Sequence, residues 1–323
     1  MFLRLTNKLT QSAITLCCIL GLADVHAARC LFVSSYHQGY PWADGIEKGV
    51  KKVLTNRCQF KQINMNTKRF KDEIYKTEKA NEIRAFIDQW KPDVIIAADD
   101  NASKYLIAPY FKESKIPVVF CGVNWTVKEY GFPTSNITGM IEVSPIQEIF
   151  EKIVLIVPGA KQGTYIGVDT LTEQKSYERF HEVAKRFNMS LLKSLAKTQA
   201  EWNQYYINAQ QTDFLILGTE SGINDWNNQA AQKIVLDYGR KFSITDYEWM
   251  THFAAMGLVK VASEQGEWAA KVALSILNGT PPSAIPIIPN QTWDMIVNEQ
   301  LLKNIDVIIP EHIRLTSKKI DAR

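Results

Sequence analysis

The 323-residue sequence has few of the residues that hold metals or act as nucleophiles, with only five cysteines and five histidines. It has no C-x-x-C pair and no histidines at ligand spacing, which argues against structural zinc. Nucleotide-binding glycine motifs and the H-E-x-x-H and G-x-S-x-G motifs of hydrolases are also missing. We therefore expect a binding protein without metal or cofactor, and keep as an alternative an enzyme whose site has no sequence signature.

The sequence also lacks an excess of charge of one sign. Its 37 basic and 34 acidic side chains leave a net charge of +3. Such an even balance argues against nucleic acid or another polyphosphate as the main partner. With 46% hydrophobic and 22% charged residues, the chain is long enough for two ordinary domains with buried cores. A small neutral or zwitterionic ligand fits this composition better.

Long apolar runs are missing except near the N-terminus. There, Arg4 and Lys8 precede a ten-residue apolar run at 14–23, and Val25-His26-Ala27 offers small residues for a signal peptidase. The run is too short to span a bilayer well. The pattern predicts a signal peptide at 1–27, cleavage after Ala27 and a periplasmic protein; an uncleaved anchor is the alternative.

Export changes the interpretation of the cysteines. Cleavage would leave Cys30, Cys58 and Cys121 in an oxidising compartment. Cys30 opens the first predicted strand and Cys58 precedes the second, and the starts of neighbouring parallel strands lie close together. We expect a Cys30–Cys58 disulfide, with three buried free thiols as the alternative.

Short β-branched runs alternate with longer amphipathic runs along the chain. In the first half, predicted strands at 30–34, 62–65, 93–98 and 116–121 are separated by predicted helices. The pattern restarts near Gly163, about 133 residues after Cys30, without obvious sequence identity. Such alternation is typical of an α/β fold, and it predicts two similar doubly wound parallel-sheet lobes.

The loops that follow the predicted strands carry the candidate site, because doubly wound folds bind ligands at the carboxyl ends of their strands. These loops combine hydroxyl, amide, acidic and aromatic side chains, which suits a ring-bearing or carboxylated small molecule. The candidate ligand-binding residues are Ser35, Tyr36, Trp42, Asp99, Asp100, Asn101, Asn124, Trp125, Asp169, Thr170, Thr219, Glu220 and Asp246. The alternative is that the polar residues are helix caps and the aromatic residues belong to the core.

Two parts of the chain resemble a known family. Gly266-Glu267-Trp268-Ala269-Ala270, 276–282, Ile285-Pro286, Ile296-Val297-Asn298 and 305–310 together resemble the end of ABC-transporter substrate-binding proteins of the tryptophan/tyrosine-binding type. Ser34-Ser35-Tyr36-His37 with Pro41-Trp42 is similar to the opening of a variant found as an extracytoplasmic sensor module of bacterial signalling proteins. The resemblance covers nearly the whole mature chain.

This resemblance implies a type I periplasmic-binding fold, with two lobes joined by a three-strand hinge and the ligand enclosed between them. On this sequence it implies crossovers near 139–143, 249–253 and 282–289. Lobe one would then be 28–142 plus 250–281, and lobe two would be 143–249 plus 282–323.

The implied function is that of a monomeric solute-binding protein that closes on an amino acid-like or aromatic, carboxylated ligand. It would deliver this ligand to an inner-membrane ABC permease. The first alternative is a sensor-input protein that reports the ligand to a membrane histidine kinase or diguanylate cyclase, and the second is a periplasmic enzyme. Asp99-Asp100-Asn101 is more acidic than expected for family members that bind aromatic amino acids, which makes Asp99, Asp100 and Asp169 the expected selectors of the ligand.

Overall fold

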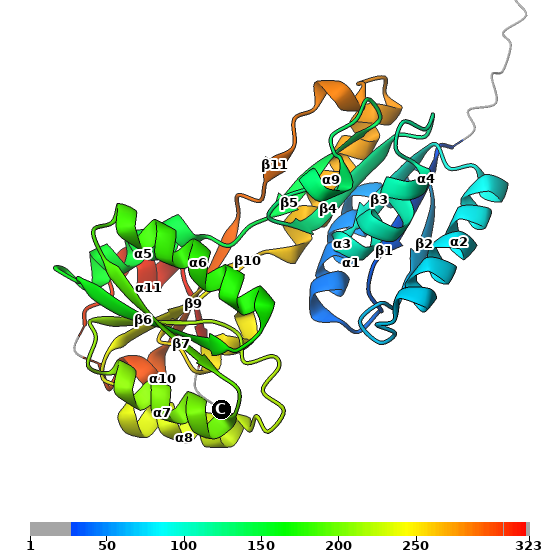
Figure 1. The fold of residues 1–323 in the computed structure, drawn as a ribbon. Coiled ribbons are helices and arrows are strands. Elements are labelled where there is room, and N and C mark those ends of the chain that lie inside the picture. The colour runs from blue at the N-terminus through cyan, green and yellow to red at the C-terminus, as the bar shows by residue number, and fades with distance from the viewer. Residues whose placement is uncertain (1–26, 306, 321–323) are drawn as a thin grey trace, which may run out of the picture.

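The computed structural model describes residues 27–305 and 307–320. They form two α/β lobes, each built on one sheet with helices packed against it (Figure 1). The predicted fold class, with two doubly wound parallel-sheet lobes, is confirmed. The predicted signal peptide lies outside the described residues except for Ala27. Within the described ranges, no helix is both long and apolar enough to cross a membrane.

The sheet of lobe one is entirely parallel, in the order β11-β5-β4-β3-β1-β2. Its strands are β1 (Arg29–Ser34), β2 (Gln59–Asn64), β3 (Val94–Ala98), β4 (Val118–Asn124), β5 (Ile137–Glu142) and β11 (Ile288–Pro289). Its helices are α1 (Pro41–Leu54), α2 (Glu73–Trp90), α3 (Asp99–Asn101), a π-helical stretch (Ala102–Ile107), α4 (Ala108–Tyr110) and α9 (Ala262–Leu277). Apolar clusters lie on both faces of this sheet, so its inner strands β1, β3, β4 and β5 are mostly buried, whereas the edge strands β2 and β11 are partly exposed.

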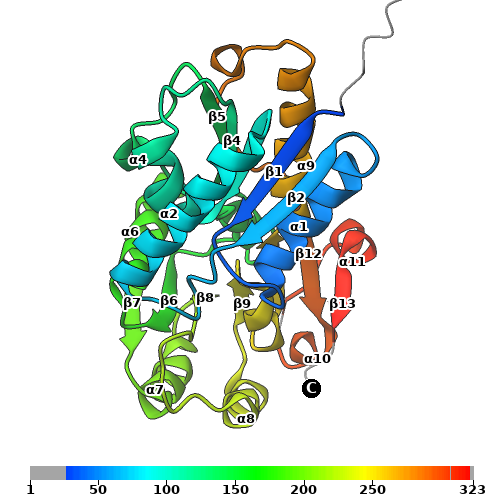
Figure 2. The ribbon, with the colours of Figure 1, turned by 90° about the vertical axis from the view of Figure 1, so that its right-hand side faces the viewer.

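Helix α9 comes from the C-terminal half of the chain but packs against α1 of lobe one (Figure 2). Two glycines allow this close approach. A Cβ on Gly49 would lie 2.2 Å from the backbone oxygen of Ser263, and one on Gly266 would lie 2.0 Å from that of Ile46. Packing therefore explains the glycine of the Gly266-Glu267-Trp268 motif.

The sheet of lobe two has the order β13-β12-β10-β9-β8-β6-β7, and among its described strands only the β10–β12 pair is antiparallel. Its strands are β6 (Gln162–Val168), β7 (Ser190–Ala196), β8 (Phe214–Leu217), β9 (Phe242–Thr245), β10 (Met256–Lys260), β12 (Trp293–Asn298) and β13 (Lys318–Ile320). Its helices are α5 (Ile146–Ile156), α6 (Leu171–Arg186), α7 (Gln199–Ala209), α8 (Asn228–Tyr238), α10 (Glu299–Leu302) and α11 (Glu311–Thr316).

Three crossovers join the lobes, and two of them differ from the expectation (Figure 1). The predicted crossover at 249–253 is wrong, because the chain continues into β10, which still pairs with β9 and β12. The predicted crossover at 282–289 is also too early, because β11 still pairs with β5. By sheet membership, lobe one is 28–142 plus 262–289 and lobe two is 143–260 plus 290–320, in place of the predicted 250–281 and 282–323. The first crossover does follow β5, whose strand character the sequence pattern did not predict.

Hydrogen bonds from backbone N–H groups to side-chain oxygens connect the crossovers to one another. The Glu264 carboxylate accepts from the backbone N–H of Gln291 and of Thr292, at 2.9 Å each. The Asn290 side chain accepts from the backbone N–H of Val143 at 2.8 Å. Each of these contacts therefore joins two different crossovers.

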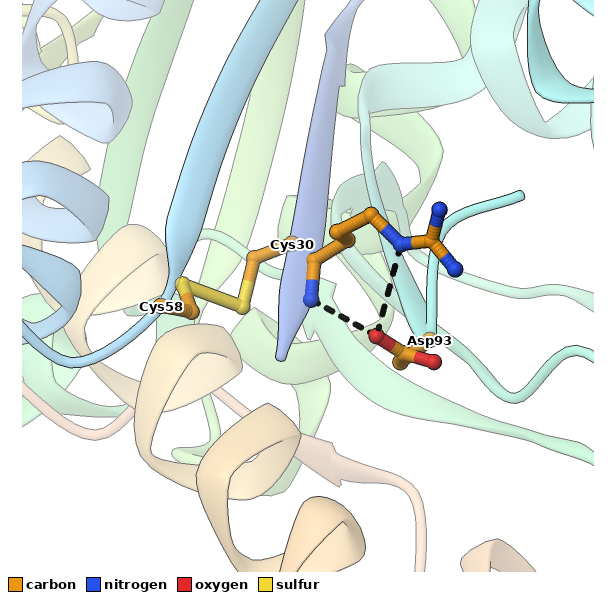
Figure 3. The surroundings of a disulfide bond; sticks show 4 residues. Cys30, Cys58 and Asp93 are labelled. Carbon is orange, nitrogen blue, oxygen red and sulfur yellow. Dashed lines mark hydrogen bonds and ion pairs between the residues drawn. A yellow bond between two sulfur atoms is a disulfide. The ribbon is translucent and has the colours of Figure 1, made fainter. Parts of the chain in front are cut away.

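A disulfide joins Cys30 to Cys58 with a Cα–Cα distance of 6.0 Å (Figure 3). It links the start of β1 to the start of β2. The bridge therefore lies at the amino ends of the strands, whereas the candidate residues follow their carboxyl ends. Beside it, Asp93 accepts from the backbone N–H of Arg29 at 2.7 Å (Figure 3). Cys121 is a buried free thiol.

Removing this disulfide should destabilise the protein without changing its ligand affinity. The bridge closes a segment of 28 residues, and the loss of such a cross-link costs about 3 kcal/mol because the unfolded chain gains freedom. We expect the Cys30→Ala/Cys58→Ala variant to unfold at lower urea concentration, and its denaturation midpoint to be insensitive to dithiothreitol. An unchanged wild-type midpoint in dithiothreitol would contradict this role of the bridge.

Candidate ligand-binding cleft

Two cavities are lined by residues of both lobes. The first, of about 540 Å³, is lined by Tyr40 of lobe one and, from lobe two, by Glu220, Ser221, Asn228, Gln229, Gln232, Trp249, His252 and Phe253. The second, of about 520 Å³, is lined by Trp125 of lobe one and, from lobe two, by Ser144, Ile146, Gln147, Glu148, Glu178, Arg179, Glu182, Val183 and Arg186. Since each cavity is lined by both lobes, its shape depends on how far the hinge is closed.

Asp99 is the buried acid of lobe one. It directly follows β3, is 1% exposed, and has a backbone φ of +68°, which is unusual for a residue other than glycine. The Trp42 indole N–H donates to its Oδ1 at 3.0 Å, while its Oδ2 has no hydrogen-bond partner among the described residues. Burial, followed by the charge of Glu142, raises the pKa of Asp99 well above its ordinary value.

Asp246 is the corresponding buried acid of lobe two. It directly follows β9, is 3% exposed, and its Oδ1 has no hydrogen-bond partner within the described part of the chain. Burial raises the pKa of Asp246, and the nearby Lys260 ammonium opposes this effect. Each lobe thus presents one buried carboxyl group with an unused oxygen, and such a group is expensive to leave unpaired.

Glu142 and Lys260 form an ion pair at the hinge, with Oε1 and Nζ 2.5 Å apart. Glu142 ends β5 and Lys260 ends β10, so the pair joins the first two crossovers. The Lys260 ammonium also lies 5.8 Å from the ring centres of both Trp42 and Tyr247, which belong to different lobes. Burial lowers the pKa of Lys260, but the charges of Glu142 and Asp246 outweigh burial and leave it raised.

Glu173 is a second buried acid of lobe two, 1% exposed. It lies three residues after the N-cap of α6, the candidate residue Thr170, whose hydroxyl accepts from the Glu173 backbone N–H. Its carboxyl group accepts from the Tyr165 hydroxyl at 2.7 Å and from the backbone N–H of Thr219 at 2.9 Å. Burial raises the pKa of Glu173 to about 7, against the opposing effect of these hydrogen bonds.

Because of this raised pKa, the contribution of Glu173 to the stability of the ligand-free protein decreases as the pH rises. Between the ordinary value of 4.5 and about 7 the folded state holds a proton that the unfolded state has lost. Because 1.36 kcal/mol corresponds to one pKa unit, Glu173 alone removes roughly 3 kcal/mol of stability across this window. We expect Glu173→Gln to flatten this part of the slope in urea denaturation between pH 4.5 and 7.5. Glu201→Gln is the matched control, since Glu201 holds the same capping position on α7 but is partly exposed; equal slopes in wild type and Glu173→Gln would contradict the assignment.

The aromatic candidates lie at the cleft but already contact cations. The Lys68 ammonium is 4.8 Å from the ring centre of Tyr36 and 4.9 Å from that of Tyr40. The Arg179 guanidinium is 4.2 Å from the ring centre of Trp125 and comes from the opposite lobe. Aromatic faces that attract cations in this way are also suited to the rings and ammonium groups of small ligands.

Several predicted ligand residues instead hold lobe one together. Ser35 is fully buried; its hydroxyl donates to the Ala98 carbonyl at 2.6 Å and accepts from the Ala102 N–H at 2.8 Å. Asp100 accepts from the Asn124 amide at 2.7 Å and from a tyrosine hydroxyl, and Asn101 donates to a threonine hydroxyl. In the ligand-free protein, the interpretation that these four residues cap helices and brace loops therefore fits better than the interpretation that their polar groups are free for a ligand.

The candidate residues in the loops of lobe two also have partners within the protein. Asp169 accepts from the Gln174 amide at 2.8 Å and lies 3.6 Å from the Lys197 ammonium. The Thr219 hydroxyl contacts Glu220, whose carboxylate also accepts from the Trp249 indole N–H at 2.9 Å. Glu220 lines the first cavity. Direct contact of any candidate with ligand stays a prediction.

The charged residues missing from the sequence-based set include Glu142, Glu173, Lys260 and Arg179. Two of them leave a signal: Glu142 and Lys260 each end an apolar run, at a point where a lone charge would be costly unless it were paired. Within the residues that the structure covers, no group of three or more metal-ligating side chains is arranged to hold an ion.

Comparison with known proteins adds the family context. A family model described as ABC transporter substrate binding protein matches residues 39–320. A tyrosine-binding protein of Clostridioides difficile (strain R20291) is 22% identical over 225 residues, which is 67% of this chain. The match spans only 64% of that relative's own length.

Two solved structures share the architecture. The ligand-free, open structure of a substrate-binding protein with adhesive properties from Clostridium difficile has a TM-score of 0.74 at 17% identity, covering 92% of this chain and 100% of that one. The ABC domain from Streptococcus pneumoniae in complex with L-Trp has a TM-score of 0.62 at 15% identity, covering 91% and 99%. At these identities the likeness establishes the fold and leaves the ligand of this chain open.

Proposed function

The chain belongs to the ABC transporter substrate-binding protein family, whose members are extracytoplasmic binding proteins and not enzymes, and on that premise we propose that its cleft binds an aromatic amino acid. The bound molecule would be delivered to an ABC importer. Related proteins are described as tyrosine-binding or were solved with L-Trp, which supports the ligand class but does not define it.

The observation that carries the proposal is the pair of buried acids, one from each lobe. Asp99 Oδ2 and Asp246 Oδ1 are both buried and have no hydrogen-bond partner among the described residues. A ligand ammonium has three N–H donors and can satisfy oxygens from both carboxylates at once. A cation at this point also adds to Lys260 in offsetting the charges of Glu142 and Asp246.

Aromatic side chains beside these acids support a ring-bearing ligand. Trp42 donates to Asp99, Tyr36 lies near the same acid, and Tyr247 follows Asp246 in the chain. All three are partly buried; Tyr36 and Trp42 belong to lobe one, and Tyr247 belongs to lobe two. Rings from both walls can sandwich a planar side chain, which adds to the area buried on closure.

Closure then follows from differential affinity. In the open form one ammonium reaches a single acid, whereas in the closed form it contacts acids of both lobes. A ligand shifts a two-state equilibrium only by the difference between its affinities for the two states, so this second contact stabilises the closed form. The closed form is the shape that an importer would recognise.

Isothermal titration calorimetry tests the ligand class. We expect L-tyrosine or L-tryptophan to bind, and 3-(4-hydroxyphenyl)propionate and indole-3-propionate, which lack the ammonium group, to bind at least about 30-fold more weakly. L-Alanine, which keeps the ammonium but lacks a ring, is the control for the aromatic wall. Equal affinity for the ammonium-bearing and ammonium-free members of a pair would contradict the role of the acids.

A further inference from the structure

We propose that Arg179, stacked on Trp125, binds the carboxylate of the ligand. The inference rests on the proposed function, because it assigns the anionic end of the same ligand. Neither Arg179 nor its helix α6 carries a sequence motif that would indicate this role. The assignment comes from the contacts and the charge balance around the second cavity.

Arg179 is a cation of the cleft whose charge is not taken up by an acid. It is partly buried, and within the described chain no carboxylate forms an ion pair with it. The acids that flank it on α6 have other partners: Glu178 pairs with Lys193 at 3.0 Å and Glu182 with Lys185 at 2.7 Å.

The other two cations of the cleft are less suitable. Lys260 is engaged by Glu142 at 2.5 Å and is further balanced by Asp246. Lys68 is exposed and rests on the rings of Tyr36 and Tyr40. Arg179 alone combines partial burial with an uncompensated charge, and burial lowers the pKa of its guanidinium without making it lose its proton.

Trp125 holds the guanidinium in place. Its backbone φ is +60°, a strained conformation for a bulky residue, and its backbone N–H donates to the Glu142 carbonyl at 2.9 Å. Strain of this kind costs of order 1–3 kcal/mol and persists where surrounding contacts fix it, typically at ligand sites. A guanidinium stacked on an indole keeps its N–H edge free, which is the edge that binds a carboxylate through two hydrogen bonds.

The cavity beside this pair extends to one neighbour of the acids that we assign to the ammonium group. It measures about 520 Å³ and includes Ser144, which lies next to the Asp246 carboxyl group. The Tyr247 side chain lies near Arg179. The remaining charged groups that line it are Glu148 and Arg186, whose charges offset each other. The site therefore offers a positive end and a negative end to one zwitterion.

The test compares ligands that differ only in the carboxylate. We expect wild type to bind L-tyrosine at least about 30-fold more tightly than tyramine, or L-tryptophan more tightly than tryptamine, and Arg179→Met to bind both members of a pair equally. Arg179→Lys should restore part of the preference, since it returns a charge without the planar fork. Lys68→Met is the matched control and should keep the wild-type preference. An Arg179→Met variant that retains this preference, or that weakens both members by the same factor, would overturn the assignment.

A second readout separates this inference from the proposed function. Phenylglyoxal modifies accessible arginines, and mass spectrometry locates the modified residue. We expect 3-phenylpropionate at millimolar concentration to slow modification of Arg179, and 3-phenylpropionamide, its neutral amide, to leave the rate unchanged. Protection by the acid alone supports the anion site even if no amino acid binds, in which case only the proposed ligand class fails. No protection by the acid would contradict the anion site, whatever the calorimetry gives.

Discussion

Replacing Asp99 or Asp246 with asparagine should weaken binding of L-tyrosine or L-tryptophan by about 2 to 4 kcal/mol, roughly 30- to 1000-fold, because each change removes one partner of a desolvated charge pair. The same changes should leave the ligand-free protein at least as stable as wild type. Burial raises the pKa of both acids, so the folded state bears a desolvation cost that a neutral asparagine avoids. Calorimetry measures the change in affinity, and thermal denaturation of the same samples measures the change in stability.

Asp169→Asn is the matched control for this pair of variants. Asp169 also follows a strand of lobe two, but it is partly exposed and already near Lys197. Its replacement should change affinity by less than about 1 kcal/mol, in line with other exposed ion pairs. If Asp99→Asn and Asp246→Asn keep wild-type affinity, or if all three variants lose it equally, the ammonium site lies elsewhere.

The second large effect concerns the hinge. Lys260→Met should destabilise the protein by about 3 to 5 kcal/mol, because it leaves the buried carboxylate of Glu142 without its partner. The Glu142→Gln/Lys260→Met variant should recover most of this loss, since it removes the stranded charge as well. Chemical denaturation gives the free energy of unfolding of each variant.

Lys233→Met supplies the control for the loss of a lysine ion pair. Lys233 pairs with Asp237 at 2.7 Å on α8, but its side chain is 77% exposed. Its replacement should change stability by less than about 0.5 kcal/mol. A double variant no more stable than Lys260→Met would mean that the lysine acts by packing between Trp42 and Tyr247, not by charge.

The fold was predictable because its strands and helices differ in apolar period. The strands of the first half, such as β1 and β3, are continuous apolar runs, and the helix-capping threonines Thr170 and Thr198 are recognisable from their local sequence. The misplaced crossovers have a common cause. β11 has only two residues and β10 only five, and pairing with distant strands, not local pattern, makes them part of a sheet.

The site was predictable only in part for a similar reason. Asp99 and Asp246 follow strands that the pattern identifies, so their position at the cleft follows from the fold. Glu142 and Lys260 end strands that the pattern missed, and Arg179 lies within a helix whose apolar stripe gives no hint of a tryptophan from the other lobe. The contact between Arg179 and Trp125, which come from different lobes, leaves no local signal in the sequence.

The sensor-input alternative stays a prediction. Its sequence support was the Ser34-Ser35-Tyr36-His37 opening, and the structure gives part of this motif a structural explanation, because Ser35 braces the start of α3 through Ala98 and Ala102. Substrate binding by a member of an ABC transporter family is compatible with either output of the closed form.

Closure of the lobes on a zwitterionic aromatic ligand is the central claim, and small-angle X-ray scattering measures it most directly. The radius of gyration should decrease when wild type is saturated with L-tyrosine or L-tryptophan, and it should stay at the ligand-free value for Asp99→Asn/Asp246→Asn under the same conditions. A wild-type radius of gyration that does not change at millimolar concentrations of both amino acids would contradict the claim.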